Sequence, residues 1–334
     1  TSGAAVLNVF INYLAEFWPT VTSPAPRAAV MTALVAGLVV VNYRGVRAGA
    51  NLSNFFSIAK LASLGLFVAA GMIMAKHVAP PTFAVPATTG AWTDALVAMV
   101  FAFGGFESAL IPAAEVKNPR VDTPFSLGVA LAVVATFYLG IHFVAMWGAP
   151  DLAHSNRPLA DAARTFAGPK GAQAMAIAAM LSAYGWATGA FVVMPRLIYA
   201  MGERGDFPRV TAAVHPRFRT PHVAIIIWAV AVLALSIYGN FMWNAILAGV
   251  ARLVTYGATC VALLQLRRRD RGTDAWRAPA GNLLALFGLA FCIFLAFRMT
   301  STHAIIMGAV VVIATVNWLM VRVRPPVPAG AAAK

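Results

Sequence analysis

The sequence predicts an all-α membrane protein of about ten transmembrane helices, on the strength of its composition and of the lengths of its apolar runs. Of the 334 residues, 60% are hydrophobic and 11% are charged, whereas soluble globular domains carry about 25% charged residues. A helix needs about 20 apolar residues to cross the bilayer core, and a barrel strand would instead show about 10 alternating residues. We therefore expect one transmembrane domain over 1–334, with spans near 1–17, 28–43, 50–75, 92–113, 124–148, 173–201, 222–238, 241–265, 282–298 and 302–321.

The first segment is the weakest of these spans, because it is short and carries Glu16 near its end. The chain begins with Thr1 rather than methionine, and apolar sequence starts almost at once. We therefore expect further residues upstream of Thr1. No basic stretch followed by a short apolar core and a cleavage site is visible, so a signal peptide is not predicted.

The distribution of Lys and Arg predicts the orientation, since cytoplasmic loops carry an excess of both. The loops at 44–49, 114–123, 202–221 and 266–281, together with the C-terminal tail, hold sixteen of them, and the alternate loops hold six. The C-terminus is thus predicted to be cytoplasmic, and with ten spans the start of the chain is too. The net charge of +14 lies in short clusters between apolar runs, which indicates membrane loops and not a nucleic-acid partner.

The fourth segment contains a glycine pair near mid-membrane, in the run Phe101-Ala102-Phe103-Gly104-Gly105-Phe106-Glu107. Each glycine weakens a helix by about 1 kcal/mol relative to alanine. An unwound stretch exposes backbone carbonyls that accept from an ammonium group, and such a break is tolerated only where it lines a cavity. Close helix packing, with Glu107 paired to a neighbouring helix, explains the same residues. Both interpretations stay open on these residues alone.

Two further intramembrane residues are candidates for function. Lys60 lies about ten residues, or ~15 Å, into its helix, too deep for easy snorkelling to water. A buried lysine gives up its proton readily, so Lys60 is either a proton carrier or a static donor to carbonyls or an acid. Trp186 lies mid-span, away from the interfacial belts, in a run of small residues that suits packing or a cavity wall. Arg252, in the eighth span, is interpreted as structural, reaching a carboxylate or a helix end.

No P-loop, HExxH, GxSxG or clustered Cys/His motif occurs in the sequence, so neither catalysis nor a metal or cofactor is predicted. The stretch AFGGFESALIPAAEVKNPRVDTP instead resembles the sixth helix and following loop of bacterial amino-acid permeases of the amino acid–polyamine–organocation superfamily. The family's E-x-x-N-P-x-x-x-x-P pattern is matched by Glu115, Asn118, Pro119 and Pro124. VNYRGVRAGANLSNFFSIAKL and PRLIYAMGERGDFPRVTAAVHPRFRTP are similar to further family regions in the same order.

The resemblance implies that the ten segments correspond to helices three to twelve of the five-plus-five inverted-repeat transporter fold. Helices one and two, which hold the carboxylate end of the family's site, have no counterpart. The resemblance further implies an aromatic gate at Phe101, the unwound amine-binding stretch at Gly104 and Gly105, and an acid of the site at Glu107. Lys60 matches the lysine whose ammonium replaces a sodium ion in proton-coupled members. Trp186 matches a position that lines the pathway in some relatives.

The sequence therefore predicts a transporter of the bacterial inner membrane that moves an amino acid with a proton by alternating access. Its expected partners are the amino acid, protons and lipid. Two alternatives remain: a sodium-coupled or exchange-only permease for amino acids or polyamines, and a non-transporting membrane protein that lacks half of the site. The substrate is left open with a lean toward neutral amino acids, and so is the oligomeric state, for which a homodimer is one option.

Overall fold

A computed structural model describes residues 1–44, 46–74, 89–110, 117–148, 152, 154–269, 278–297 and 301–322 of the protein. Within these ranges the regular structure is helical and contains no strand. The helices are α1 (Ser2–Leu14), α2 (Pro24–Arg44), α3 (Val46–Met74), α4 (Thr89–Ala102), α5 (Pro119–Gly148), α6 (Pro158–Arg204), α7 (His222–Tyr238), α8 (Phe241–Arg269), α9 (Gly281–Phe297) and α10 (Ser301–Arg322). Short 3₁₀ turns occur at η1 (Pro19–Thr22), η3 (Phe106–Leu110) and η5 (Arg209–Ala212).

Each of the ten predicted segments overlaps one of these helices, and the segment 222–238 coincides with α7. By length and composition, five of the described helical stretches could cross a membrane: Pro24–Arg44, Asn54–Met74, Val121–Gly148, Pro158–Arg204 and Phe241–Arg269. Helices α1, α7 and α9 are apolar but shorter. Residues 75–88, Glu115 and the tail after Arg322 lie outside the described residues.

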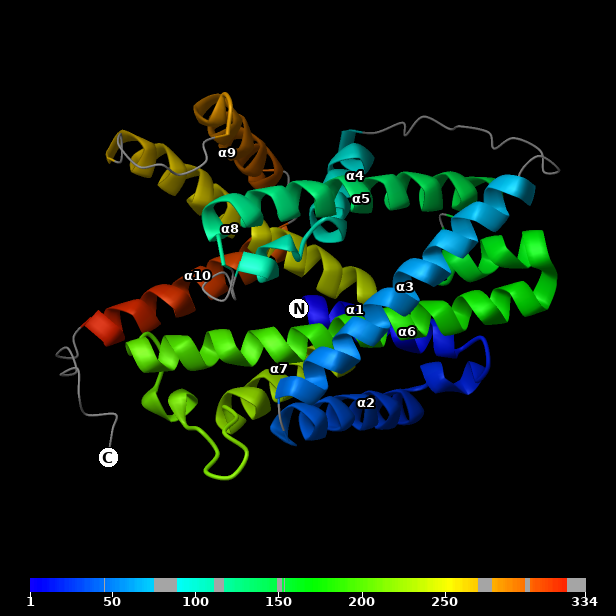
Figure 1. Ribbon diagram of the computed structural model, residues 1–334, viewed down its shortest axis with the longest axis horizontal. Helices are drawn as coiled ribbons and strands as arrows, with labels where there is room; N and C mark the ends of the chain where they lie inside the picture. Colours follow the sequence, from blue (N-terminus) through cyan, green and yellow to red (C-terminus); the bar gives the residue numbers. More distant parts are fainter. Residues whose placement is uncertain are drawn as a thin grey trace.

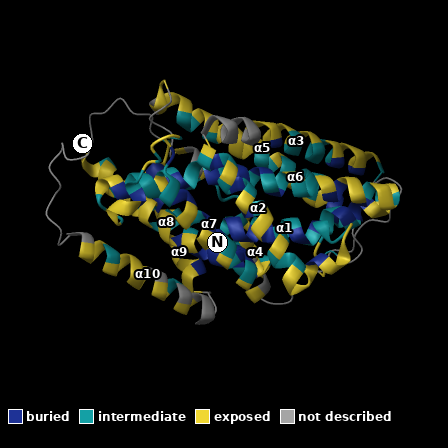
Figure 2. Ribbon diagram, turned by 90° about the horizontal axis from the view of Figure 1, so that it is seen from below, coloured by how far each residue is buried: buried dark blue, intermediate teal, exposed yellow. Residues whose placement is uncertain are grey.

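The buried residues concentrate where α1, α2, α6 and α7 meet, whereas α9 and α10 are mostly exposed (Figure 2). One buried cluster joins Leu7 of α1, Leu38 of α2, Phe191 of α6 and Val232 of α7. Lipid offers no hydrophobic drive for helix association, so packing in a membrane relies on close contact between small residues. Gly185 illustrates this, because a Cβ placed on it would lie only 2.3 Å from the Cβ of Phe56 on α3.

Helix α6 is the longest element and runs along the bundle with α3 lying across it (Figure 1). It begins at Pro158, where a proline at the first helical turn costs no hydrogen bond. Much of the stretch between the predicted spans 124–148 and 173–201 is therefore helical. The helical dihedrals break at Ala167 and Gly168, and Gly168 has a positive φ of 67° just before Pro169. The bend separates a short outer arm (158–166) from the long predicted span.

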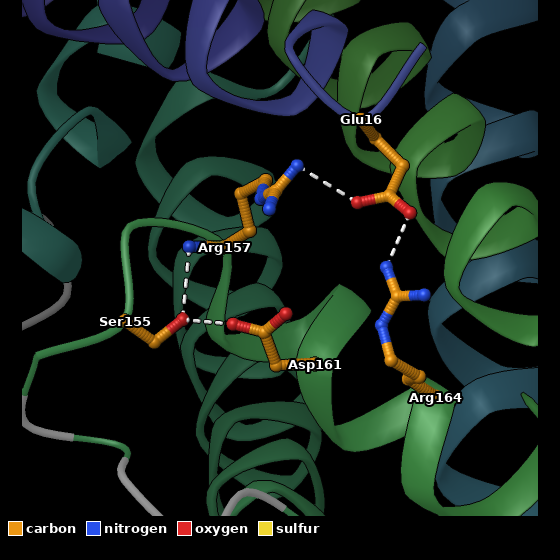
Figure 3. A network of polar contacts seen from close by, with 5 residues as sticks. All are labelled: Glu16, Ser155, Arg157, Asp161 and Arg164. Carbon is orange, nitrogen blue, oxygen red and sulfur yellow. Dashed lines mark hydrogen bonds and ion pairs between the residues drawn. The ribbon is translucent and has the colours of Figure 1, made fainter. Parts of the chain in front are cut away.

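The end of α2 meets the segment before α7, which contains part of the predicted cytoplasmic loop 202–221. The hydroxyl of Thr220, just before α7, donates to the carbonyl of Tyr43 near the end of α2, at 2.9 Å. The Tyr43 ring packs against His215 with centroids 5.1 Å apart. Elsewhere, Glu16 after α1 forms ion pairs with Arg157, just before the outer arm, and with Arg164 within it (Figure 3).

Candidate functional site: a broken helix and a buried ion pair

The helix predicted over 92–113 stops at Ala102. A turn over Phe103–Gly105 follows, and then the 3₁₀ segment η3 (Phe106–Leu110). The carbonyl of Ala102, which has no partner within a helix that ends there, accepts a 2.8 Å hydrogen bond from the hydroxyl of Tyr138 on α5. The rings of Phe103 and Tyr138 also meet, with centroids 5.1 Å apart. The break is therefore held in place by α5.

The two glycines at the break are required for different reasons. Gly105 has φ of 116°, in the region that a side chain disfavours. Gly104 lies against the guanidinium of Arg252 on α8, and a Cβ built on it would be 2.3 Å from the Arg252 Cζ and Nε atoms. Gly104 therefore permits the close approach of the Arg252 side chain, and Gly105 permits the turn.

Glu107 accepts hydrogen bonds from three directions. The Nε of Arg252 donates to Oε1 at 3.0 Å, the Tyr256 hydroxyl donates to Oε2 at 3.2 Å, and the backbone N–H of Gly105 donates to Oε2 at 2.8 Å. Arg252 and Tyr256 lie one turn apart on α8, so they present both donors on one face. The Arg252 side chain is 12% exposed and that of Glu107 is 33% exposed. The carboxylate is thus paired yet still accessible.

Arg252 makes further contacts around the ion pair. Its guanidinium lies 5.8 Å from the centroid of the Phe101 ring, within the range of a cation–π contact. Phe101 in turn meets Phe241 edge-on at 6.1 Å. The Nη1 atom of Arg252 is buried and has no hydrogen-bond partner in the described part of the chain. One donor of this cation is therefore available to a further acceptor.

Sequence reasoning assigned Arg252 only a structural role and did not single out Tyr256. The structure identifies Glu107 as the carboxylate that Arg252 reaches, although the two residues are 145 positions apart. No local spacing could have indicated this pairing, since it depends on how α8 packs against α4. The only feature of the sequence that pointed to Arg252 was its charge at membrane depth.

Lys60 lies at the middle of α3 and is half-buried. It lies one turn from Phe56, which packs on Gly185 and Tyr184 of α6, and one turn from Leu64, which packs with a second buried cluster. Among the residues that the structure describes, no acceptor contacts the Lys60 ammonium. No hydrogen bond or ion pair joins it to Glu107. The two predicted ionisable site residues therefore belong to separate environments.

Trp186, the last predicted site residue, is half-buried on α6. A Cβ built on Gly3 of α1 would lie 3.9 Å from its ring. Its neighbours Ala187 and Thr188 are buried in the core. The surroundings of Trp186 are thus mainly those of helix packing. In the described ranges, no group of three His, Cys, Asp or Glu side chains is placed to hold a metal ion.

Comparison with known proteins identifies the family of the chain. The sequence profile described as "Amino acid permease" matches residues 1–321. The chain belongs to the amino acid permease family. An uncharacterized transporter of Mycobacterium tuberculosis (strain ATCC 25618 / H37Rv) is 28% identical over 279 residues, which cover 83% of this chain and 62% of the relative.

Two Bacillus subtilis (strain 168) proteins with more specific names are also similar. The methylthioribose transporter is 25% identical over 277 residues, covering 81% of this chain and 59% of the relative. The branched-chain amino acid permease BcaP is 23% identical over 327 residues, covering 93% of this chain and 68% of the relative. The chain spans about three fifths of the length of the first curated relatives that it matches.

Proposed function

We propose that this permease chain transports an amino acid together with a proton, by alternating access in the bacterial inner membrane. The observation that carries the proposal is the break between α4 and η3, where Glu107 and Arg252 form a partly accessible ion pair. Broken helices at membrane depth form the substrate sites of many secondary transporters. Family membership supports transport in general, and the broken helix supports this location for the site.

The ion pair suggests how the amine of a substrate is bound. The Glu107 carboxylate is a third exposed, so an arriving ammonium group can share it or displace Arg252 from it. Released from Glu107, the Arg252 guanidinium keeps its contact with Phe101 and presents an unpaired donor to the substrate. Phe101 would then cover the bound molecule. Binding of the amine would thereby replace the Arg252–Glu107 ion pair with one between the amine and Glu107, while the freed Arg252 would pair with the carboxylate of the same amino acid.

Lys60 is proposed to carry the coupling proton. Its ammonium has no partner in the described residues and lies at the centre of α3, so its charged form is costly and its neutral form is accessible. Sodium coupling would instead need a cluster of oxygen ligands in place of a cation. The alternatives of sodium-coupled or exchange-only transport are tested by the ion dependence of uptake.

The test is uptake of radiolabelled L-leucine into proteoliposomes with an imposed pH gradient. We expect Lys60→Ala to lose stimulation by the gradient and to retain leucine exchange, whereas Lys170→Ala, an exposed lysine on α6, should behave as wild type. Undiminished gradient-driven uptake by Lys60→Ala would refute the assigned role. A wild-type chain that takes up no amino acid under any gradient would refute transport by this chain.

The orientation proposed for the protein has a cytoplasmic C-terminus. Its support is the excess of Lys and Arg in one set of loops. In the structure, two segments on the predicted inner side meet each other, as do two segments on the predicted outer side. The expected partners are the amino acid, the proton and the surrounding lipid.

A further inference from the structure

A second polar region lies at the end of the bundle that the distribution of charge places outside, and it adjoins the broken helix at Phe241, which meets Phe101. A cavity of about 620 Å³ opens between the end of α1, the start of α2, the segment before α6 and the link from α7 to α8. Its polar lining includes Asn8, Asn12, Arg27, Ser155 and Asn240. These segments include three that the distribution of charge places outside. We call this space the outer cavity.

Arg27 is fixed in the wall of the outer cavity by three hydrogen bonds from one nitrogen. Its Nη2 donates to Asn8 Oδ1 at 2.6 Å, to the Ser236 carbonyl at 3.0 Å and to the Gly239 carbonyl at 2.6 Å. The two carbonyls belong to the C-terminal end of α7, where a cation is favourable. The Nε and Nη1 atoms have no partner among the described residues, so two donor groups of a rigidly held guanidinium remain for a ligand.

The positive charge of Arg27 is not neutralised by a described carboxylate. No acid lines the outer cavity. The two acids nearby in the fold are both engaged: Glu16 with Arg157 and Arg164, and Asp161 with the hydroxyl of Ser155 at 2.5 Å (Figure 3). These contacts also hold the segment that forms one wall. Asp161 keeps its negative charge behind Ser155, but no described carboxylate contacts Arg27, so the outer cavity offers a pre-positioned cation to a small anion.

We propose that the outer cavity binds a free amino acid through its carboxylate, on the external side of the broken helix, which it adjoins at Phe241. Both bidentate faces of the guanidinium include the Nη2 group that the fold already holds, so Arg27 offers a carboxylate single charge-assisted hydrogen bonds from Nε or Nη1. Asn12 makes no hydrogen bond within the described chain, so its amide oxygen is free to accept from the amine of the ligand. The volume falls within the ~300–1,000 Å³ range of small-molecule sites. This inference rests on the proposed function for its ligand class, and it adds a binding site that the amino acid reaches first from the external side.

The first experiment measures binding of L-leucine to the detergent-solubilised chain by calorimetry. Asn12→Leu fills the outer cavity without removing any hydrogen bond of the fold, and Arg27→Gln removes the charge. We expect each variant to weaken binding at this site by about tenfold or more, the loss of one charged hydrogen bond. Thr32→Leu, an exposed polar-to-leucine change on α2, is the matched control and should leave binding unchanged.

A local readout separates this site from the broken helix. Asn156→Cys places a thiol at the lining of the outer cavity, and its labelling by a maleimide should slow in the presence of L-leucine or acetate. L-Leucinamide, which lacks the carboxylate, should give no protection. Equal protection by leucinamide, or binding by Asn12→Leu equal to that of wild type, would overturn the proposal. Protection that persists in a chain unable to take up amino acids would refute the transport function and leave the outer site standing.

Discussion

The contact between Gly104 and Arg252 makes a prediction about stability that the structure allows to be worked out. A Cβ at position 104 would lie 2.3 Å from Arg252 Nε, whereas ordinary contacts begin at 3.4 Å, so the guanidinium has to retreat by about 1.1 Å, the difference of the two. We expect this shift to break the 3.0 Å hydrogen bond to Glu107. Gly104 has no positive φ, so an alanine there adds no backbone strain.

The expected cost of Gly104→Ala is about 1–2 kcal/mol. A hydrogen bond between charged groups contributes about 1.5–3 kcal/mol, and the lower part applies because Glu107 is 33% exposed and partly screened. The assay is reversible unfolding of the purified chain in mixed detergent micelles with increasing dodecyl sulfate. Gly128→Ala on α5 is the control, since no atom lies within 4 Å of its Cβ, and it should be neutral or stabilising by up to ~1 kcal/mol.

A double-mutant cycle decides whether the cost arises through Arg252. In an Arg252→Met background the ion pair is already absent, so adding Gly104→Ala should have little further effect. The reasoning is refuted if Gly104→Ala is as stable as wild type, or if its full cost persists in that background.

Three further changes test other parts of the fold. Gly105→Ala should destabilise the chain by about 1–2 kcal/mol in the same unfolding assay, because φ of 116° strains a side-chain-bearing residue; no loss would contradict the strained turn. Glu16→Gln should speed amide hydrogen exchange in the outer arm, since both Arg157 and Arg164 lose their partner, and an unchanged rate would show that the arm is held by other contacts. Asn244→Ala should cost about 1–3 kcal/mol on unfolding, because this fully buried amide donates to the Leu235 and Asn240 carbonyls at 3.0 Å each; a neutral effect would show that water replaces it.

The sequence by itself determined the fold class and the course of the helices. Helical hydrogen bonds join residues four apart, and a segment in lipid has to satisfy its backbone internally, so an apolar run of sufficient length predicts its own helix. The predicted segment 222–238 coincides with α7 for this reason. The glycine pair likewise marked the place where α4 ends, since both glycines weaken a helix locally. The motif around Glu107 indicated the family that the whole-chain comparison then showed.

Only the tertiary structure decided which polar groups meet. The sequence left Gly104 open between backbone exposure and packing, and the structure shows that it makes room for Arg252. The sequence also left open whether an acid or a carbonyl pairs with Lys60, and in the described residues neither does. The outer cavity joins segments that are far apart in sequence. The physical reason is the same in all three cases. A polar group at membrane depth is expected to have a partner or to line a cavity. Its position along the chain does not specify which helix provides that partner or that cavity wall, because this depends on how the helices pack.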